Sequence, residues 1–314
     1  MNRPLDNNEA SGYGRFINAA YAMYLRDRTQ LQPEPAEGDI PDPYELVACL
    51  NMSDFIFGDK SCKFYGLIAR HRQQKHQFVL AIRGTEGLME WLDDAVVHLV
   101  PFRQVPNAGR VAQGFDTIYS SLQVIRRPRV ADGAATAKAT VAASAASAQS
   151  AQPAPEKMSG SFTEQLEQLA DSLEEPTVQM QIRAKTARPP RSFVVTGHSL
   201  GAALATLFVM ENWDKKKFDV STICTFASPR VGNTEFARTF NQLPLTSWRI
   251  VNSLDIVPKV PMNVPMFFDY EHVDSPCEFS SGEQVKWNPV CWHSMKTYLH
   301  QLDQTIPVDP ECKS

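Results

Sequence analysis

Ser199 stands in a pattern that can make a serine nucleophilic. It is the centre of Gly197-His198-Ser199-Leu200-Gly201, which matches the G-x-S-x-G pattern of a nucleophile elbow, with a β-branched run before it and an alanine-rich run after it. In such an elbow a sharp turn from strand to helix exposes the serine hydroxyl, and the small glycines relieve crowding. The pentapeptide alone also fits a tight turn with an incidental serine, but the flanking strand-like and helix-like runs favour the elbow.

A serine hydroxyl needs a base that accepts its proton and an acid that orients the base. In chains with this elbow the acid and the histidine follow the serine, which leaves His272, His293 and His300 as candidate bases. His293 stands at a loop-to-helix junction, whereas His300 lies further along the predicted helix. The pattern alone does not choose between His272 and His293.

Asp255 is the first candidate for the acid. It follows an apolar strand-like run, which would carry it to the carboxyl edge of a sheet, where loops carry function in such folds. The alternatives Asp269, Glu271 and Asp274 lie in a segment that has neither strand nor helix periodicity.

Strand-like and helix-like segments alternate along much of the chain. Near the start, Phe16, Ile17, Ala20, Tyr21 and Tyr24 recur at the spacing of an amphipathic helix. The expected helices are residues 12–27, 200–213 and 234–243, and the expected strands are residues 63–70, 77–84, 193–197, 220–229 and 247–257. This alternation predicts an α/β fold with a mostly parallel central sheet and helices on both faces.

The length of 314 residues and the hydrophobic fraction of 43% suit one catalytic domain over residues 1–314. Residues near 130–157 are rich in Ala, Ser, Thr and Pro and can bury little large apolar surface, so we expect an exposed insertion there, with an alanine-rich helix as the alternative. Ser161 and Glu164 follow at the spacing of a capping box that opens an amphipathic helix. The insertion would then lie between two elements of one domain.

The composition argues against several classes of partner. With 31 basic and 35 acidic residues the formal charge is −4, and no basic block could follow a phosphate backbone, so we expect no nucleic-acid partner. No apolar run reaches the length of a transmembrane segment, and the first residues lack the pattern of a secretion signal. We therefore expect a soluble protein that is cytoplasmic or exported by a non-standard route, with a mature chain whose signal has been removed as the alternative.

The six cysteines form no CxxC or Cys/His pattern of a metal site, and we expect neither a metal nor an organic cofactor. Most of the six are expected to be buried thiols. Cys277 and Cys291 are the pair that an oxidising compartment could bridge, and the sequence does not decide whether it does.

Six ordered segments resemble the class 3 lipases, the α/β-hydrolase family that includes the filamentous-fungal triacylglycerol lipases. They extend from about residue 60 to about residue 300 and read VLAIRGTEGLMEWLDD, QGFDTIYSSL, FVVTGHSLGAALATL, TFASPRVGN, WRIVNSLDIVPKVP and CWHSMKTYL. The resemblance implies an α/β-hydrolase fold and a serine hydrolase that cleaves carboxylic esters of lipids, with a triacylglycerol lipase as the first expectation. A lipid ester is therefore the expected partner.

The resemblance also selects among the candidate residues. The family's catalytic histidine is followed by a serine and then a tyrosine, as His293 is, whereas His272 corresponds to a non-catalytic histidine of the family. Asp255, shortly before a valine and a proline, corresponds to the family's acid. The implied triad is Ser199, Asp255 and His293.

The resemblance implies two donors for the oxyanion. One is the backbone N–H of Leu200, directly after the nucleophile, and the other is Thr85, directly after an Arg-Gly pair at the end of a strand, through its N–H and its hydroxyl. A plain strand end and turn is the alternative for this segment, with Arg83 paired to Asp94 to hold the loop.

In family lipases the segment after this strand forms a lid, a short amphipathic helix that covers the serine and moves away at an oil–water interface. The candidate lid consists of Leu88, Met89, Trp91 and Leu92, with acidic residues between them, and implies transient contact with an oil–water or membrane interface. Apolar residues at this spacing also suit a helix packed on the core.

Two positions depart from the family pattern. Gln113 stands where the family commonly has histidine and Ala227 where it has glycine, which affects the expected pocket shape more than the mechanism. The substrate stays open, because the same fold and triad serve short-chain carboxylesterases, feruloyl esterases and phospholipases A1. A catalytically silent lipase-like binding protein is the alternative from another class, and acyl transfer to an alcohol is a further one.

Overall fold

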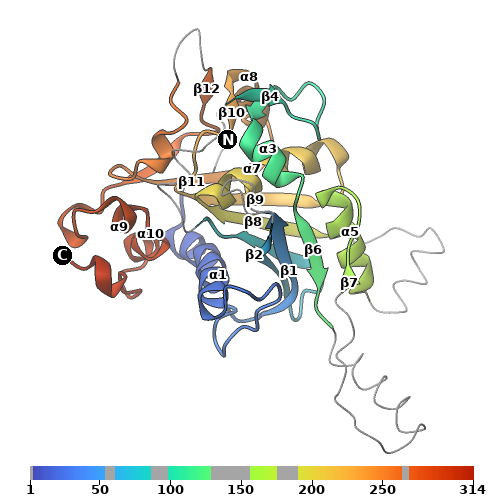
Figure 1. Ribbon diagram of the computed structural model, residues 1–314, viewed down its shortest axis with the longest axis horizontal. Coiled ribbons are helices and arrows are strands. Elements are labelled where there is room, and N and C mark those ends of the chain that lie inside the picture. Colours follow the sequence, from blue (N-terminus) through green and yellow to red (C-terminus); the bar gives the residue numbers. More distant parts are fainter. Residues whose placement is uncertain (1–2, 54–60, 86–97, 129–155, 175–189, 264–268) are drawn as a thin grey trace, which may run out of the picture.

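A computed structural model describes residues 3–53, 61–85, 98–128, 156–174, 190–263 and 269–314 (Figure 1). The candidate lid of Leu88, Met89, Trp91 and Leu92 lies outside these residues, as does nearly all of the segment near 130–157. The candidate triad, the elbow and Thr85 are among the described residues.

Nine strands of the described chain form one sheet in the order β13-β11-β9-β8-β3-β2-β1-β6-β7 (Figure 1). Their bounds are β1 Tyr44–Ser53, β2 Cys62–His71, β3 Gln77–Ile82, β6 Gln123–Arg126, β7 Glu156–Lys157, β8 Ser192–His198, β9 Asp219–Phe226, β11 Thr246–Asn252 and β13 Pro276–Phe279. Neighbours from β3 to β13 pair in parallel, and neighbours from β3 to β7 pair antiparallel. The expected α/β architecture with parallel central strands is confirmed, and the antiparallel extension contains β1, which the sequence analysis missed.

Successive side chains of β3 enter two different hydrophobic clusters. Phe78 and Leu80 belong to one cluster, and Val79 and Ala81 belong to the other. Because side chains alternate between the faces of a strand, these clusters are the two faces of the sheet. The first is covered by α3 (Gln113–Tyr119), α5 (Phe162–Ser172) and α7 (Leu200–Lys215), and the second by α1 (Asn7–Arg26) and α10 (Met295–Leu302).

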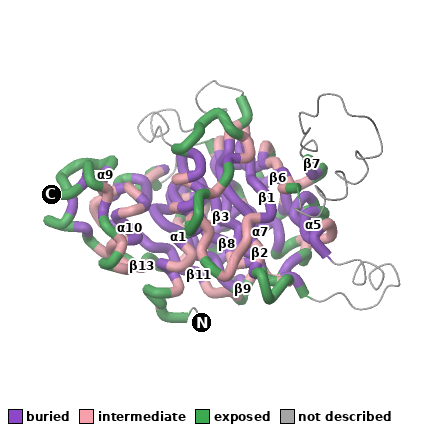
Figure 2. Tube along the Cα trace, turned by 90° about the horizontal axis from the view of Figure 1, so that it is seen from below, coloured by how far each residue is buried: buried purple, intermediate pink, exposed green. Residues whose placement is uncertain are grey.

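Helices therefore cover both faces, as predicted, and the buried residues gather along the central strands between them (Figure 2). The capping box of α5 is also confirmed, because Ser161 accepts the N–H of Glu164 while Glu164 accepts the N–H of Ser161 over 2.8 Å. None of the helices in the described ranges combines the length and the apolar character that crossing a membrane requires.

A second sheet of the described chain has the strand order β12-β10-β5-β4 (Figure 1). Its strands are β4 Leu99–Pro101, β5 Arg110–Ala112, β10 Gly232–Asn233 and β12 Tyr270–Glu271. The other helices within the described ranges are α8 Thr234–Phe240 and α9 Pro289–His293, with short 3-10 turns at Val257–Lys259, Gly282–Gln284 and Pro310–Cys312.

The structure decides the cysteine pairing that the sequence left open, and the candidate bridge between Cys277 and Cys291 is not formed. Cys291 is bridged to Cys312, with Cα atoms 5.3 Å apart, and Cys277 is a free, partly buried thiol of β13. The bridge joins α9 to the 3-10 turn near the carboxyl end, which folds back onto it. The parallel pairing of β13 with β11 holds Cys277 in the main sheet.

Candidate active site

Ser199 occupies the sharp turn between β8 and α7. β8 ends at His198 and α7 begins at Leu200, and the single residue between them has φ 57° and ψ −126°. A positive φ strains a residue that carries a Cβ, at a cost on the order of 1–3 kcal/mol, and persists where the surrounding structure enforces it. The backbone thus has the shape expected of a nucleophile elbow.

The glycines of the motif allow close packing at this turn. A Cβ at Gly201 would lie 2.2 Å from the carbonyl oxygen of Ile82, and a Cβ at Gly197 would lie 2.3 Å from that of Gly201. Both contacts are with backbone atoms, so no change of rotamer could relieve them. The start of α7 can therefore lie against the end of β3 only because these positions lack side chains.

His293 and Asp255 meet where α9 approaches the end of β11. His293 Nδ1 lies 2.7 Å from Asp255 Oδ2, with both residues buried. The other two candidate bases, His272 and His300, each bond a backbone carbonyl oxygen instead, at 2.6 and 2.7 Å. Of the three histidines left open by the sequence pattern, the structure brings only His293 to Asp255.

The alternative acids have other surroundings. Asp269 accepts the hydroxyl of Thr234 over 2.6 Å, and Glu271 is an exposed residue of β12. Asp274 accepts the N–H of Ser275 over 2.8 Å.

Asp255 is a buried carboxylate with donors on both oxygens. Besides His293, the Tyr298 hydroxyl donates to Oδ2 over 2.8 Å and the Val257 N–H donates to Oδ1 over 2.9 Å. A buried charge is tolerated when its lone pairs are satisfied in this way. Burial, together with the Asp255 charge, raises the pKa of Tyr298 well above its usual value, so the hydroxyl remains a donor.

Ser199 Oγ and His293 Nε2 are both buried, and neither atom has a hydrogen-bond partner among the described residues. Buried polar atoms in native proteins are nearly always paired, so each exception asks for an explanation. These are the two atoms between which a serine–histidine pair transfers a proton. The arrangement can therefore support nucleophilic attack by the serine, with the imidazole as its base.

The expected oxyanion segment lies against the elbow. A Cβ at Gly84 would be 2.8 Å from Ser199 Cβ and 2.7 Å from the Tyr21 hydroxyl oxygen. Thr85 follows directly and is buried, as is Leu200. Leu200 is the first residue of α7, where backbone N–H groups have no partner within the helix and are available to a ligand.

Arg83 anchors the end of β3 through the backbone. Its guanidinium donates to the carbonyl oxygen of Phe64 over 2.7 and 3.0 Å and to that of Gly84 over 2.7 Å. The same group lies over the rings of Tyr24 and Tyr65, 3.6 and 4.2 Å from their centroids. Its expected partner Asp94 lies outside the described residues.

Tyr21 is a contributor to the site that sequence reasoning missed. The helical spacing assigned it to the apolar face of α1, yet its hydroxyl accepts the Gly84 N–H over 2.8 Å and lies 2.8 Å from His198 Nδ1. No local signal marks this tyrosine, because its polar partners lie far along the chain.

Ala227 and Gln113, the two departures from the family pattern, each directly follow a strand. Ala227 directly follows β9 and has φ 52°, a left-handed conformation that costs a residue with a Cβ about 1–2 kcal/mol. This explains why glycine suits the position. Gln113 is the exposed first residue of α3.

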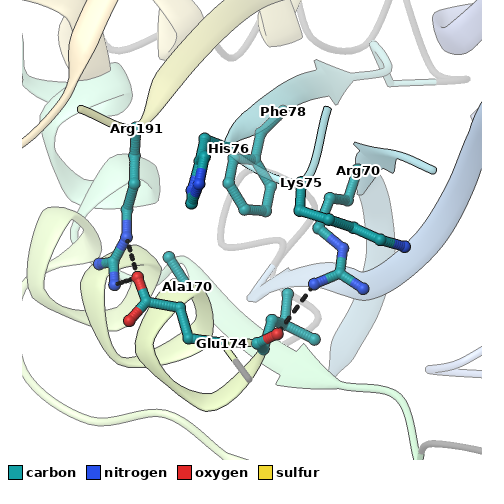
Figure 3. Close-up of a pocket in the computed structure, with 8 residues that line it drawn as sticks. Arg70, Lys75, His76, Phe78, Ala170, Glu174 and Arg191 are labelled. Atoms are coloured by element: carbon teal, nitrogen blue, oxygen red, sulfur yellow. Dashed lines mark hydrogen bonds and ion pairs between the residues drawn. The ribbon is translucent and has the colours of Figure 1, made fainter. Parts of the chain in front are cut away.

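A cavity of about 200 Å³ lies at the opposite end of the central strands, where Phe78 is the second residue of β3 and Arg191 directly precedes β8 (Figure 3). Its charged groups are paired: Arg191 Nε donates to Glu174 over 3.0 Å, and Arg70 donates to the Leu173 carbonyl oxygen over 2.9 Å. Because the cavity lies where β3 and β8 begin, it is separate from the site, which lies at the carboxyl ends of the strands. The described ranges also contain no group of His, Cys, Asp or Glu side chains that could hold a metal ion.

Comparison with known proteins identifies the family of this chain. The family described as lipase (class 3) matches residues 79–264. Phospholipase A1-II 4 of Oryza sativa subsp. japonica is 30% identical over 310 residues, covering 90% of this chain and 68% of that protein. Phospholipase A1-II 1 of Oryza sativa subsp. indica is 28% identical over 244 residues, covering 74% of this chain and 51% of that protein, so the chain spans about half the length of this relative.

The fold has solved counterparts. The crystal structure of a lipase from Rhizopus microsporus var. chinensis matches with a TM-score of 0.51 and 21% identity, covering 87% of this chain and 74% of that one. This likeness confirms the α/β-hydrolase fold. Together with the match of the family over residues 79–264, it leads to one conclusion: the chain belongs to the class 3 lipase family.

Proposed function

We propose that this chain hydrolyses carboxylic esters of lipids through an acyl-enzyme on Ser199. The observation that carries the proposal is the hydrogen bond between His293 Nδ1 and Asp255. His293 Nε2 and Ser199 Oγ are buried as well, and neither atom has a hydrogen-bond partner among the described residues. An acid bonded to Nδ1 keeps the imidazole in the tautomer whose Nε2 can act as a base. Membership of the class 3 lipase family supports lipid esters as the substrate class.

In the proposed reaction Ser199 Oγ attacks the ester carbonyl carbon while His293 Nε2 takes the hydroxyl proton. Asp255 stabilises the imidazolium, and the backbone N–H groups of Leu200 and Thr85 hold the oxyanion, where losing one donor typically costs about a hundredfold in rate. His293 then protonates the leaving alkoxide. A water molecule deprotonated by the same ring cleaves the acyl-enzyme and releases the fatty acid.

Exposed apolar side chains beside the proposed base and acid support a lipid substrate. Ile256 and Met262 follow Asp255, and Trp287 and Val290 precede His293. Trp287 is 82% exposed, far more than a large aromatic side chain usually is in a soluble domain. A large aromatic ring exposed in this way is suited to contact with a lipid interface or with another protein.

Two substrates lie within this proposal. The resemblance to fungal lipases leads to triacylglycerol, whereas the names of the rice relatives, phospholipases A1, favour a phospholipid. In both cases the described residues would act as one catalytic domain, since Ser199 and Asp255 follow β8 and β11 of the main sheet and His293, the last residue of α9, bonds Asp255.

The test compares hydrolysis of p-nitrophenyl butyrate, emulsified triolein and phosphatidylcholine vesicles by the protein and by its Ser199→Ala variant. Ser221→Ala, a change at an exposed position of β9, serves as the control. We expect the butyrate and at least one lipid to be cleaved, with loss of activity in Ser199→Ala alone. Full activity in Ser199→Ala, or no cleavage and no labelling of Ser199 by an organophosphonate, would overturn the proposal.

A further inference from the structure

His198, the residue before the proposed nucleophile, is bonded at both ring nitrogens. Its Nδ1 lies 2.8 Å from the Tyr21 hydroxyl oxygen, and its Nε2 lies 2.9 Å from the backbone carbonyl oxygen of His293. The side chain is buried, with 2% of its surface exposed. The mechanism proposed above gives this imidazole no role.

The partners determine which nitrogen carries the hydrogen. A carbonyl oxygen can only accept, so Nε2 must donate to His293, and Nδ1 of a neutral ring must then accept from the Tyr21 hydroxyl. The Tyr21 oxygen in turn accepts the Gly84 N–H over 2.8 Å. The result is one directional relay from Gly84 N–H through Tyr21 and His198 to the His293 carbonyl oxygen.

The ring is held neutral by its surroundings. Burial lowers the pKa of His198 well below its usual value, and the neighbouring His293 ring, 4.6 Å away between centroids, acts in the same direction. Within the described residues the ring also meets the Tyr21 hydroxyl and the ring of Tyr298, 6.0 Å away between centroids, and neither group carries a carboxylate that would favour an imidazolium.

We propose that His198 is a positioning residue that holds the base and the oxyanion segment at fixed places relative to Ser199. The backbone of His198 leads directly into the elbow, and its Nε2–H donates to the carbonyl oxygen of His293. Its Nδ1 accepts from Tyr21, whose oxygen in turn accepts the Gly84 N–H. Asp255 orients the imidazole of His293, and His198 holds the backbone from which that imidazole projects. A misplacement of about 1 Å at a reacting group can cost on the order of a hundredfold in rate.

The inference rests on the proposed function, and kinetic variants test it. His198→Phe fills similar space but removes both hydrogen bonds, His198→Gln retains an amide donor for the His293 carbonyl, and Tyr21→Phe removes the middle of the relay. On p-nitrophenyl butyrate we expect kcat to fall at least about tenfold in His198→Phe, with KM little changed, and to fall less in His198→Gln. Tyr13→Phe is the control, because it removes a hydroxyl bonded to Glu9 on the same helix.

The double variant separates a relay from two independent packing effects. Residues that act through one network have non-additive effects, so adding Tyr21→Phe to His198→Phe should lower kcat little further. Additive losses, or an unchanged kcat in a His198→Phe protein that remains folded by thermal unfolding, would overturn the proposal.

A second measurement does not depend on activity. In protein labelled with ¹⁵N-histidine, the His198 signals, identified by their loss in His198→Gln, should show the Nε2–H tautomer and should not titrate between about pH 5 and 9. An Nδ1–H tautomer, or titration near the ordinary value, would overturn the relay. If the wild-type protein cleaves no ester, the proposed function fails, and the ¹⁵N spectra still decide whether the relay exists.

Discussion

Tyr298 donates its hydroxyl hydrogen to Asp255 Oδ2 over 2.8 Å, the same oxygen that lies 2.7 Å from His293 Nδ1. The Tyr298 oxygen also accepts the Asn252 N–H over 3.1 Å. One phenol therefore connects the end of β11, the proposed acid and helix α10. The orientation of the acid depends on a side chain outside the proposed triad.

Tyr298→Phe should weaken both stability and turnover. The change leaves Asp255 Oδ2 and the Asn252 N–H each short of one buried partner, which costs about 1–3 kcal/mol of unfolding free energy. We expect kcat on p-nitrophenyl butyrate to fall several-fold with KM nearly unchanged. Urea unfolding and steady-state kinetics measure the two effects, and wild-type values of both would show that the hydroxyl does not support Asp255.

His272 should make the protein less stable in acid. Burial, reinforced by the positive charge of Arg249, lowers the pKa of His272 to about 3, whereas the unfolded value is about 6.5. The unfolded chain therefore binds more protons between these values. This contribution to stability is complete above about pH 6.5 and is lost by up to about 1.4 kcal/mol per pH unit as the pH falls toward 3.

His272→Gln keeps a donor for the Pro258 carbonyl oxygen but cannot titrate. Between about pH 6.5 and 5 we expect this variant to lose about 2 kcal/mol less unfolding free energy than the wild-type protein. Denaturant unfolding at the two pH values measures the difference. Equal losses in both proteins would contradict the lowered pKa.

The Cys291–Cys312 bridge should stabilise the part of the chain that carries His293. It closes a loop with a sequence separation of 21, for which chain entropy in the unfolded state predicts about 3 kcal/mol. We expect Cys312→Ser to lower the unfolding free energy by about this amount, and Cys277→Ser, a change of a free thiol, to have a smaller effect. Peptide mapping that found Cys277 bridged to Cys291 would refute the pairing.

Trp287→Ala should lower activity on lipid surfaces but not on dissolved esters. If the exposed ring contacts the substrate aggregate, the rate on emulsified triolein or phosphatidylcholine vesicles should fall several-fold while the rate on p-nitrophenyl butyrate stays constant. Trp213→Ala is the matched control, because Trp213 is 46% exposed but lies near the far end of α7 from Ser199. An equal loss on all three substrates would indicate a structural effect of Trp287 instead.

Features encoded over a few neighbouring residues could be predicted from the sequence. The elbow at Ser199 depends on the strand-forming run before it, the helix-forming run after it and two glycines whose neighbours are backbone atoms. The capping box of Ser161 and Glu164 likewise depends on a spacing of three. The fold class followed from the alternation of strands and helices, because each element must bury its apolar face against another layer. β1 escaped prediction because residues 47–52 are continuously buried and show no alternation.

Apart from the pairing of His293 with Asp255, which the family resemblance also implied, the long-range pairings were decided only by the tertiary structure. From residue types alone, His272 and His293 were equal candidates, and what separates them is that α9 approaches the end of β11 while His272 turns to the Pro258 carbonyl. Cys291 meets Cys312 because the carboxyl end folds back onto α9, and Tyr21 reaches His198 because α1 packs across the central strands. Such contacts depend on strand order and helix packing, which join residues far apart in the chain, and local periodicity carries no information about them.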